Sequence, residues 1–325
     1  MTILKTLAAV ALIGSAAFAG TTAAKAQDYP TRQITMIVPF AAGGPTDVVA
    51  RLVGEQMSKT LGQPIIIENV VGAGGTTGAT RASRATNDGY TIIMGHMGTH
   101  AASLALYPKL AYDPRTDFEP IALINGAPIV ILGKKDLPPK DLKEFVDYVK
   151  KNESSVNQAH AGVGAVSYIT CGLLNGVIGI NPVGVPFQGT GPAMNALVGG
   201  QVDYMCDQIT NVVGQVKAGT IKAYAVATPE RNASLPDVPT TTEAGLPGYQ
   251  TTAWNALFAP KGTPPAILTK LNAAAAKALD DEKVIARMKD LGNDIPKADQ
   301  RTPAVLGNLV KEEVDKWKKF LKPVG

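Results

Sequence analysis

Residues 34–47 read ITMIVPFAAGGPTD, and this stretch decides the predicted fold. Five mostly apolar residues are followed by a loop, residues 39–45, whose two prolines and two glycines cannot continue a strand. From Thr46 an amphipathic helix is expected to about Leu61, with Gly62 in the position of a C-terminal cap. The stretch therefore predicts a strand, a glycine-rich loop and a helix, in that order.

The same unit recurs along the chain. Further short strands are predicted at residues 65–69, 90–94, 121–123, 129–132, 157–160, 182–187, 202–206, 223–228 and 254–259. Helices are expected between many of them, and the C-terminal part is predicted to be helical over residues 266–279, 282–291 and 304–321. Repeated strand–loop–helix units predict an α/β protein with mostly parallel sheets and helices on both faces.

The length and order of these units predict two lobes. Roughly 300 residues exceed what a single hydrophobic core usually serves. We expect lobe 1 to comprise residues 27–126 and 250–325 and lobe 2 to comprise residues 127–249, so that the chain crosses between the lobes twice. This layout is typical of a hinged clamp that closes on a ligand in a cleft.

The N-terminus predicts export. Residues 1–26 contain a positive start, a short apolar run at residues 7–19 and the tripeptide Ala-Lys-Ala at residues 24–26. These features are typical of a secretory signal peptide cleaved before Gln27, and no later stretch is apolar enough to span a bilayer. The remaining chain has 29 basic and 27 acidic residues, a net charge of +2, which is too weakly basic to indicate nucleic-acid binding.

The two cysteines, Cys171 and Cys206, are expected to form a disulfide in an oxidising export compartment. Two buried free thiols are the alternative. Neither cysteine has the spacing of a metal ligand, and we expect no metal and no cofactor.

Glycine-rich loops offer the clearest candidate site. The loops at residues 39–45, 71–78 and 161–164 each follow a predicted strand and precede a helix, and the loop at 188–192 has the same character. Backbone N–H groups and helix N-termini at the carboxyl edge of a sheet attract anions, so a carboxylate ligand is predicted.

The alternatives are a dinucleotide site and an exported enzyme. The glycines at residues 72–78 resemble a Rossmann turn, but Thr77 occupies the place of the third glycine. No HExxH or GxSxG motif is present, so catalysis is not predicted. Asp207, at a predicted strand end, is expected either to accept a hydrogen bond from the ligand or to cap the following helix.

Several motifs resemble a known family in one order along nearly the whole chain after residue 26. They are PFAAGGPTD at 39–47, EN with GAGG at 68–75, DGYT at 88–91, GTHA at 98–101, YPKL with YDP at 107–114, FQGTGPA at 187–193, GGQVD at 199–203, LPDVPT at 235–240 and FAPKGTP at 258–264. Together they resemble the receptors of tripartite tricarboxylate transporters, the Bug proteins.

The resemblance implies a type II-like periplasmic binding protein with two doubly wound sheets, a ligand cleft between them and a two-component membrane permease as its partner. It implies that the loops at residues 40–47 and 161–167 grip one ligand carboxylate and that other cleft positions select the rest. The implied ligand-binding residues are Phe40, Ala41, Gly43, Asp47, Gly74, Thr99, Ala161, Gly162, Val163, Gly164, Ser167, Thr190 and Asp207.

Two segments, the loop at residues 160–168 and residues 187–189, depart from the family pattern and bear on the ligand. Ala165 lacks a hydroxyl that is frequent there, Tyr168 stands where histidine is common, and Gln188 replaces a basic residue. A mono- or dicarboxylate or an aromatic acid is therefore expected rather than a tricarboxylate. A monomer fits the clamp mechanism, and a sensor that presents its ligand to a signalling partner is the alternative role.

Overall fold

The computed structural model of the protein describes residues 29–323. The predicted signal peptide, residues 1–26, lies outside the described residues. Within the described part, no helix is sufficiently long and apolar to cross a membrane.

The unit at the start of the chain folds as its sequence predicts. Strand β1 (Ile34–Val38) leads through the glycine-rich loop into helix α1 (Pro45–Leu61), which Gly62 ends in the left-handed conformation with a φ of 69°. Strands β2 (Ile65–Asn69) and β3 (Thr91–His96) pair in parallel with the two sides of β1. The loop before α1 therefore lies at the carboxyl edge of this sheet.

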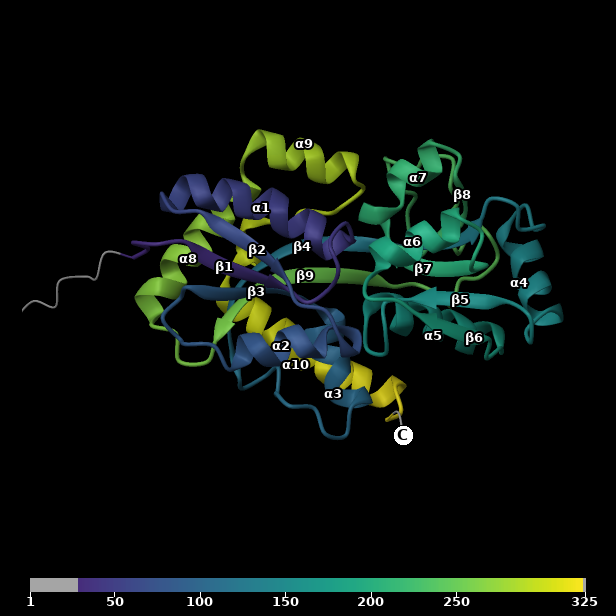
Figure 1. Ribbon diagram of the computed structural model, residues 1–325. Coiled ribbons are helices and arrows are strands. Elements are labelled where there is room, and N and C mark those ends of the chain that lie inside the picture. The colour runs from purple at the N-terminus through teal and green to yellow at the C-terminus, as the bar shows by residue number, and fades with distance from the viewer. Residues whose placement is uncertain (1–28, 324–325) are drawn as a thin grey trace, which may run out of the picture.

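Two long strands connect the lobes. Strand β4 (Phe118–Lys134) pairs with β9 (Thr252–Pro260) in antiparallel fashion over most of the length of β9, and Figure 1 shows both running between the two lobes. The two short strands expected at residues 121–123 and 129–132 are one strand. The stretch between the predicted segments stays paired, because residues 125–128 lie opposite residues 252–255 of β9. The register shifts between Pro120 and Ala122 and between Leu123 and Asn125, as at a β-bulge.

The second lobe repeats the parallel unit. Strand β5 (Asn157–His160) lies between β6 (Val183–Pro186) and β7 (Tyr204–Gln208) and is parallel to both. Strands β7 and β8 (Ile221–Val226) are antiparallel to β4. The expectation of mostly parallel sheets thus holds within each lobe but is wrong at the centre, because β4 and β9 run against their neighbours and join the two sheets into one.

Helices cover the sheet of each lobe. In lobe 2 the helices are α4 (Leu142–Lys151), α5 (Val166–Ile178), α6 (Thr190–Val198), η3 (Ile209–Asn211) and α7 (Val213–Lys217). In lobe 1, besides α1, they are η1 (Ala73–Gly75), α2 (Thr76–Ser83), η2 (Gly98–Ala102), α3 (Ser103–Leu106), α8 (Pro265–Leu279), α9 (Glu282–Asp290), η4 (Ala298–Arg301) and α10 (Pro303–Phe320).

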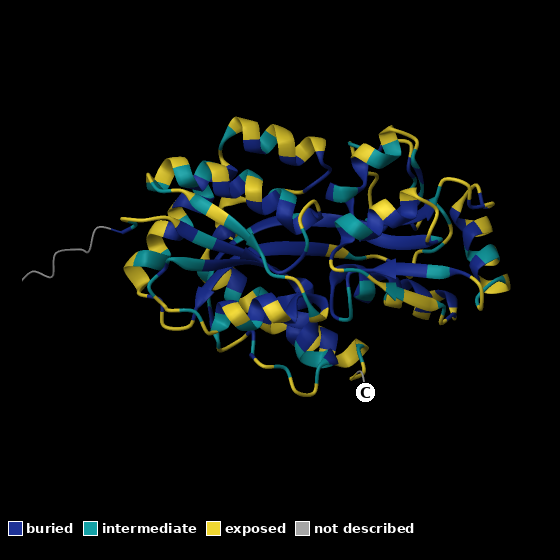
Figure 2. Cartoon of the chain, in the orientation of Figure 1, coloured by how far each residue is buried: buried dark blue, intermediate teal, exposed yellow. Residues whose placement is uncertain are grey.

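The central strands are buried on both faces, as the dark blue strands of Figure 2 show, whereas the edge strands β2 and β6 are partly exposed. In β1, Met36 and Val38 pack into the cluster that contains α1 and α8, whereas Ile37 packs into the opposite cluster with residues of α10. Successive side chains of a strand point to opposite faces, so a strand covered on both sides is apolar throughout. This explains the uninterrupted apolar runs in the sequence.

The predicted disulfide is present. Cys171 on α5 and Cys206 on β7 are bonded, with their Cα atoms 5.2 Å apart, and both are fully buried. The bond fastens α5 to the central sheet of lobe 2.

Candidate functional site

Three helix N-termini meet at one small cavity between the lobes, here named the inner cavity. Helix α1 comes from lobe 1, and helices α5 and α6 come from lobe 2. Its lining residues are Phe40, Gly44, Pro45, Thr46, Asp47, His96, Ala161, Ala165, Val166, Ser167, Thr190 and Gln208. The first N–H groups of a helix have no acceptor within it, and the helix dipole adds positive potential at that end.

The inner cavity suits one small anionic group. Its volume is about 20 Å³, which is close to what one water molecule needs. None of the lining residues of the described chain is lysine or arginine. An anion held here would therefore rest on neutral donors and helix ends.

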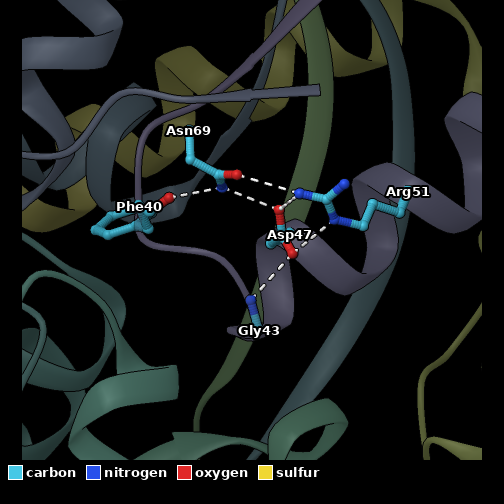
Figure 3. A network of polar contacts seen from close by, with 5 residues as sticks. All are labelled: Phe40, Gly43, Asp47, Arg51 and Asn69. Atoms are coloured by element: carbon cyan, nitrogen blue, oxygen red, sulfur yellow. Dashed lines mark hydrogen bonds and ion pairs between the residues drawn. The ribbon is translucent and has the colours of Figure 1, made fainter. Parts of the chain in front are cut away.

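Asp47 belongs to the wall of the cavity but its carboxylate is already occupied (Figure 3). It accepts hydrogen bonds from the Gly43 N–H at 3.0 Å, from Arg51 Nε and Nη2 at 2.9 Å each, and from Asn69 Nδ2 at 2.9 Å. Asn69 Nδ2 also donates to the carbonyl of Phe40 at 2.8 Å. The network fixes the course of the loop that leads into α1.

The charge of Asp47 is stable at neutral pH. Burial opposes ionisation, but the hydrogen bonds from Arg51, Gly43 and Asn69 outweigh it and hold the pKa of Asp47 below its usual range. Asp47 therefore holds the loop in place. Each of its two carboxylate oxygens already accepts two hydrogen bonds, so neither is left to accept one from a ligand.

His96 contributes a neutral donor. Its Nδ1 accepts hydrogen bonds from the N–H groups of Gly98 at 2.9 Å and Thr99 at 3.2 Å, so the ring proton lies on Nε2. The ring stacks on Phe40 with centroids 4.9 Å apart. Burial lowers the pKa of His96 to about 4, so the ring is uncharged at neutral pH and offers an N–H to the cavity.

The loop of lobe 2 is held by neutral hydrogen bonds. The Ala161 N–H donates to Ser167 Oγ at 2.9 Å, and the Gly162 N–H donates to His160 Nδ1 at 3.0 Å. Because Ser167 Oγ serves here as an acceptor, its own proton remains free to donate into the cavity that Ser167 lines.

Asp207 lies behind the cavity wall and is fully buried. Its carboxylate accepts from the N–H of Gln208, which directly precedes η3, at 2.8 Å and from Nδ2 of Asn211, the last residue of η3, at 2.7 Å. Burial raises the pKa of Asp207 to about 7, although the hydrogen bonds from Asn211, Gln208 and Thr190 act in the opposite direction. Its neighbour Gln208 lines the inner cavity.

A larger cavity, here named the outer cavity, adjoins the inner one. Its volume is about 540 Å³. Its lining residues are Phe40, Gly72, Ala73, Gly74, Gly75, Tyr107, Ala161, Gly162, Val163, Pro186, Phe187, Gln188 and Pro192. Phe40 and Ala161 line both cavities, so one ligand can place an anionic end in the inner cavity and its body in the outer one.

The lobes touch around these cavities. The Ala41 N–H donates to the carbonyl of Gln188 at 3.0 Å, and the Tyr107 hydroxyl lies 2.8 Å from the carbonyl of Val163. Gly74, with a φ of 61°, lies so close that a Cβ atom there would collide with the carbonyl of Val163. The two lobes are thus in contact around both cavities.

The structure distributes the predicted ligand-binding residues over three settings. Phe40, Asp47, Ala161, Ser167 and Thr190 line the inner cavity, and Gly74, Gly162 and Val163 line the outer one. The rest line neither cavity: Ala41, Gly43, Thr99, Gly164 and Asp207. Two of these five residues take part in hydrogen bonds that hold the neighbouring loops: Gly43 donates to Asp47, and Asp207 accepts from Gln208.

Sequence reasoning did not select His96 and Gln208, which both line the inner cavity. Both lie in the last position of a strand, β3 and β7 respectively. Their place at a strand end is the signal that could have indicated them, because ligands of α/β sheets bind beyond the carboxyl ends of strands.

Known proteins similar to this chain have the same architecture. The family described as tripartite tricarboxylate transporter family receptor matches residues 49–325. MatC from Rhodopseudomonas palustris, solved with bound malate, is 56% identical with a TM-score of 0.88, over 90% of this chain and 99% of MatC. The periplasmic binding protein BugD is 42% identical with a TM-score of 0.89, over 91% of this chain and 100% of BugD.

A more distant R. palustris protein, solved with adipate, is 31% identical with a TM-score of 0.85, and the likeness covers 91% of this chain and 100% of that protein. The family match begins within α1 and covers the rest of the chain, and the three solved structures each align with about nine-tenths of it. The chain therefore belongs to the tripartite tricarboxylate transporter receptor family of two-lobed periplasmic binding proteins.

Proposed function

We propose that this chain is a periplasmic receptor that captures a small organic mono- or dicarboxylate, or an aromatic acid, and delivers it to the permease of a tripartite tricarboxylate-type transporter. The convergence of three helix N-termini from two lobes on one inner cavity carries the proposal. The malate in MatC and the adipate in the more distant relative support a carboxylate as ligand.

Binding uses the two cavities in different ways. One carboxylate of the ligand lies in the inner cavity, where the N-termini of α1, α5 and α6, together with the His96 N–H, donate to it. The rest of the ligand lies in the outer cavity, whose described lining likewise contains no lysine or arginine. A dicarboxylate of the size of malate suits the pair of cavities, and the ligand leaves chemically unchanged.

Export and closure complete the proposal. Residues 1–26 direct the chain to the periplasm and are removed there. Residues 127–249 then rotate as lobe 2 against the rest of the chain about β4 and β9, and the bound ligand favours the closed arrangement. The receptor acts as a monomer and presents its closed form to the permease.

Isothermal titration calorimetry of residues 27–325 tests the proposal, with malate, adipate, benzoate and citrate as ligands and glucose as the control. We expect one saturable site for malate with a Kd of about 1 μM or tighter, since a few charge-assisted hydrogen bonds give about 8 kcal/mol after ordering costs. Chromatography of the recovered ligand should show it intact. Heats no larger than those of glucose for every acid, or turnover of a bound acid, would contradict the proposed function.

A further inference from the structure

Asn255 links the two walls of the inner cavity. It lies on β9, is fully buried, and faces His96 of β3 and Asn125 of β4 in the strand register. Thr46 Oγ1 donates to Asn255 Oδ1 at 3.1 Å, and Asn255 Nδ2 donates to Gln208 Oε1 at 3.0 Å and to Asn125 Oδ1 at 3.1 Å. One amide thus bonds a cavity residue of lobe 1, Thr46, and a cavity residue of lobe 2, Gln208.

These hydrogen bonds fix which atom of Gln208 is left for a ligand. Since Gln208 Oε1 accepts from Asn255, the remaining polar group of the side chain is the Nε2 amino group, which has two protons to donate. Within residues 29–323, Gln208 Nε2 forms no hydrogen bond to another residue, and Gln208 lines the inner cavity. The amide orientation follows from this network of partners.

We propose that Asn255 is a positioning residue for ligand binding: it keeps the amide of Gln208 turned so that its N–H groups donate to the carboxylate in the inner cavity. Asn255 itself does not line that cavity. The inference rests on the proposed function in that the recognised group is a carboxylate. It goes beyond that function because it explains how the site selects an anion: a reversed Gln208 amide would point its oxygen at the carboxylate and repel it.

The chain contains a closely matched control. Asn175 on α5 is also buried, its Nδ2 donates to Gln158 Oε1 at 2.6 Å, and its Oδ1 accepts from the Tyr204 hydroxyl at 2.9 Å. Like Asn255, Asn175 donates to a glutamine oxygen and accepts from a hydroxyl group. Neither Asn175 nor Gln158 lines the inner cavity, however. A change at Asn175 therefore reports the cost of damaging a buried amide pair alone.

The test compares Asn255→Asp with Asn175→Asp by calorimetric titration with malate at pH 8 and pH 5.5. The introduced carboxylate at 255 has no proton to donate, so Gln208 must turn its Nε2 toward it and its Oε1 toward the cavity. We expect malate to bind Asn255→Asp about 100-fold more weakly than the wild type at pH 8, the equivalent of losing one charge-assisted hydrogen bond. Asn175→Asp should stay within about threefold of the wild type.

The pH profile separates positioning from general damage. Burial raises the pKa of a carboxyl group, so at pH 5.5 the introduced group regains a proton and can again donate to Gln208 Oε1. Its bonded neighbours Thr46, Gln208 and Asn125 do not titrate, and His96 stays uncharged above pH about 4. Asp207, which is bonded to the Gln208 N–H, has a pKa of about 7, but it is present in both variants, so its titration cancels in the comparison. The deficit of Asn255→Asp relative to Asn175→Asp should therefore shrink at least about fivefold at pH 5.5. Equal affinities of the two variants, or an unchanged deficit, would overturn the inference.

A measurement without ligand keeps this test distinct from that of the proposed function. The NMR signals of the Gln208 side-chain amide are assigned as the ones that are missing from the spectrum of Gln208→Glu. We expect the protons of this amide to exchange rapidly with water in the wild type and to be protected in Asn255→Asp at pH 8, where they donate to the carboxylate. The same exchange rate in both proteins contradicts the inference even if malate binds.

If Asn255→Asp does not fold, Asn255→Ser replaces it. We expect Asn255→Ser to bind malate about tenfold more weakly than the wild type at both pH values. An affinity equal to that of the wild type would contradict the inference.

Discussion

Two carboxyl groups lie beside the same inner cavity, and their pKa values are shifted in opposite directions. Asp47, in lobe 1, is paired with Arg51, and its pKa lies below the usual range. Asp207, in lobe 2, has the amide of Asn211 and the Gln208 N–H as hydrogen-bond donors, and burial raises its pKa to about 7. Both residues hold a loop in place, but only one of them does so as a permanent anion.

The difference follows from solvent access and partners. Arg51 brings a cation that is itself half exposed, so the pair keeps contact with water and the charge on Asp47 is stabilised. Asp207 is fully buried among neutral donors, and hydrogen bonds alone do not offset the loss of hydration. A negative charge close to a carboxylate site also opposes the ligand, and the partial protonation of Asp207 at neutral pH lessens that opposition.

The largest expected effect tests the lobe 2 carboxylate. The pKa of Asp207 in the folded protein, about 7, lies above its ordinary value of 3.8, so the folded state binds a proton that the unfolded state has lost. Stability should therefore fall as pH rises from about 4 to about 7, by up to about 4 kcal/mol from this group. In Asp207→Asn this contribution disappears, and urea unfolding at several pH values measures it. Parallel pH profiles for the variant and the wild type would show that Asp207 does not titrate in this range.

The next effect tests the lobe 1 carboxylate. Asp47→Asn keeps the shape of the side chain but removes the charge that Arg51 and Gly43 contact. We expect a loss of about 2–3 kcal/mol in the free energy of unfolding at pH 7. The wild type has this contribution at and above neutral pH and loses it as pH falls through the lowered pKa of Asp47. Urea unfolding at pH 7 and at pH 3 measures both statements.

A second ion pair on the same helix supplies the control for Asp47. Glu55 and Lys59 on α1 have the same spacing of four residues, 2.9 Å between Lys59 Nζ and Glu55 Oε1, and both are exposed. Because exposed pairs of this kind contribute little, Glu55→Gln should unfold like the wild type. An effect of Glu55→Gln as large as that of Asp47→Asn would show that the loop network adds nothing beyond an ordinary helix pair.

The sequence allowed the loops to be predicted better than the states of these carboxylates. The pattern ITMIV followed by PFAAGGP places the loop before α1 at the carboxyl edge of the sheet, and the structure has it there. This succeeded because strand, glycine turn and helix start are local features of the chain. The antiparallel centre was missed, since the pairing of β4 with β9 joins residues more than 120 positions apart.

The role of Asp207 shows what local patterns cannot supply. The sequence left open whether its carboxylate meets the ligand or caps the next helix, because both need only a strand end. Its complete burial depends on β7 packing between β4 and β5, and its neighbour Gln208 reaches the inner cavity instead. Asn255 carried no local signal, because its partners Thr46 and Gln208 lie 209 and 47 residues away along the chain.

The smallest expected effect concerns a contact between the lobes that depends on neither carboxylate. The Tyr107 hydroxyl of lobe 1 lies 2.8 Å from the Val163 carbonyl of lobe 2 and 3.2 Å from the Ala73 carbonyl of its own lobe, and its one proton serves the shorter bond best. Tyr107→Phe should weaken malate binding about fivefold, or about 1 kcal/mol, equally at pH 6 and pH 8. Tyr112→Phe is the control, because the Tyr112 hydroxyl donates to Thr99 within lobe 1 at 2.6 Å and its loss should leave the malate Kd unchanged. If calorimetry gives the two variants the same Kd, the Tyr107 hydroxyl does not hold the lobes together. If the loss of affinity in Tyr107→Phe depends on pH, the contact between Tyr107 and Val163 depends on the charge of Asp207.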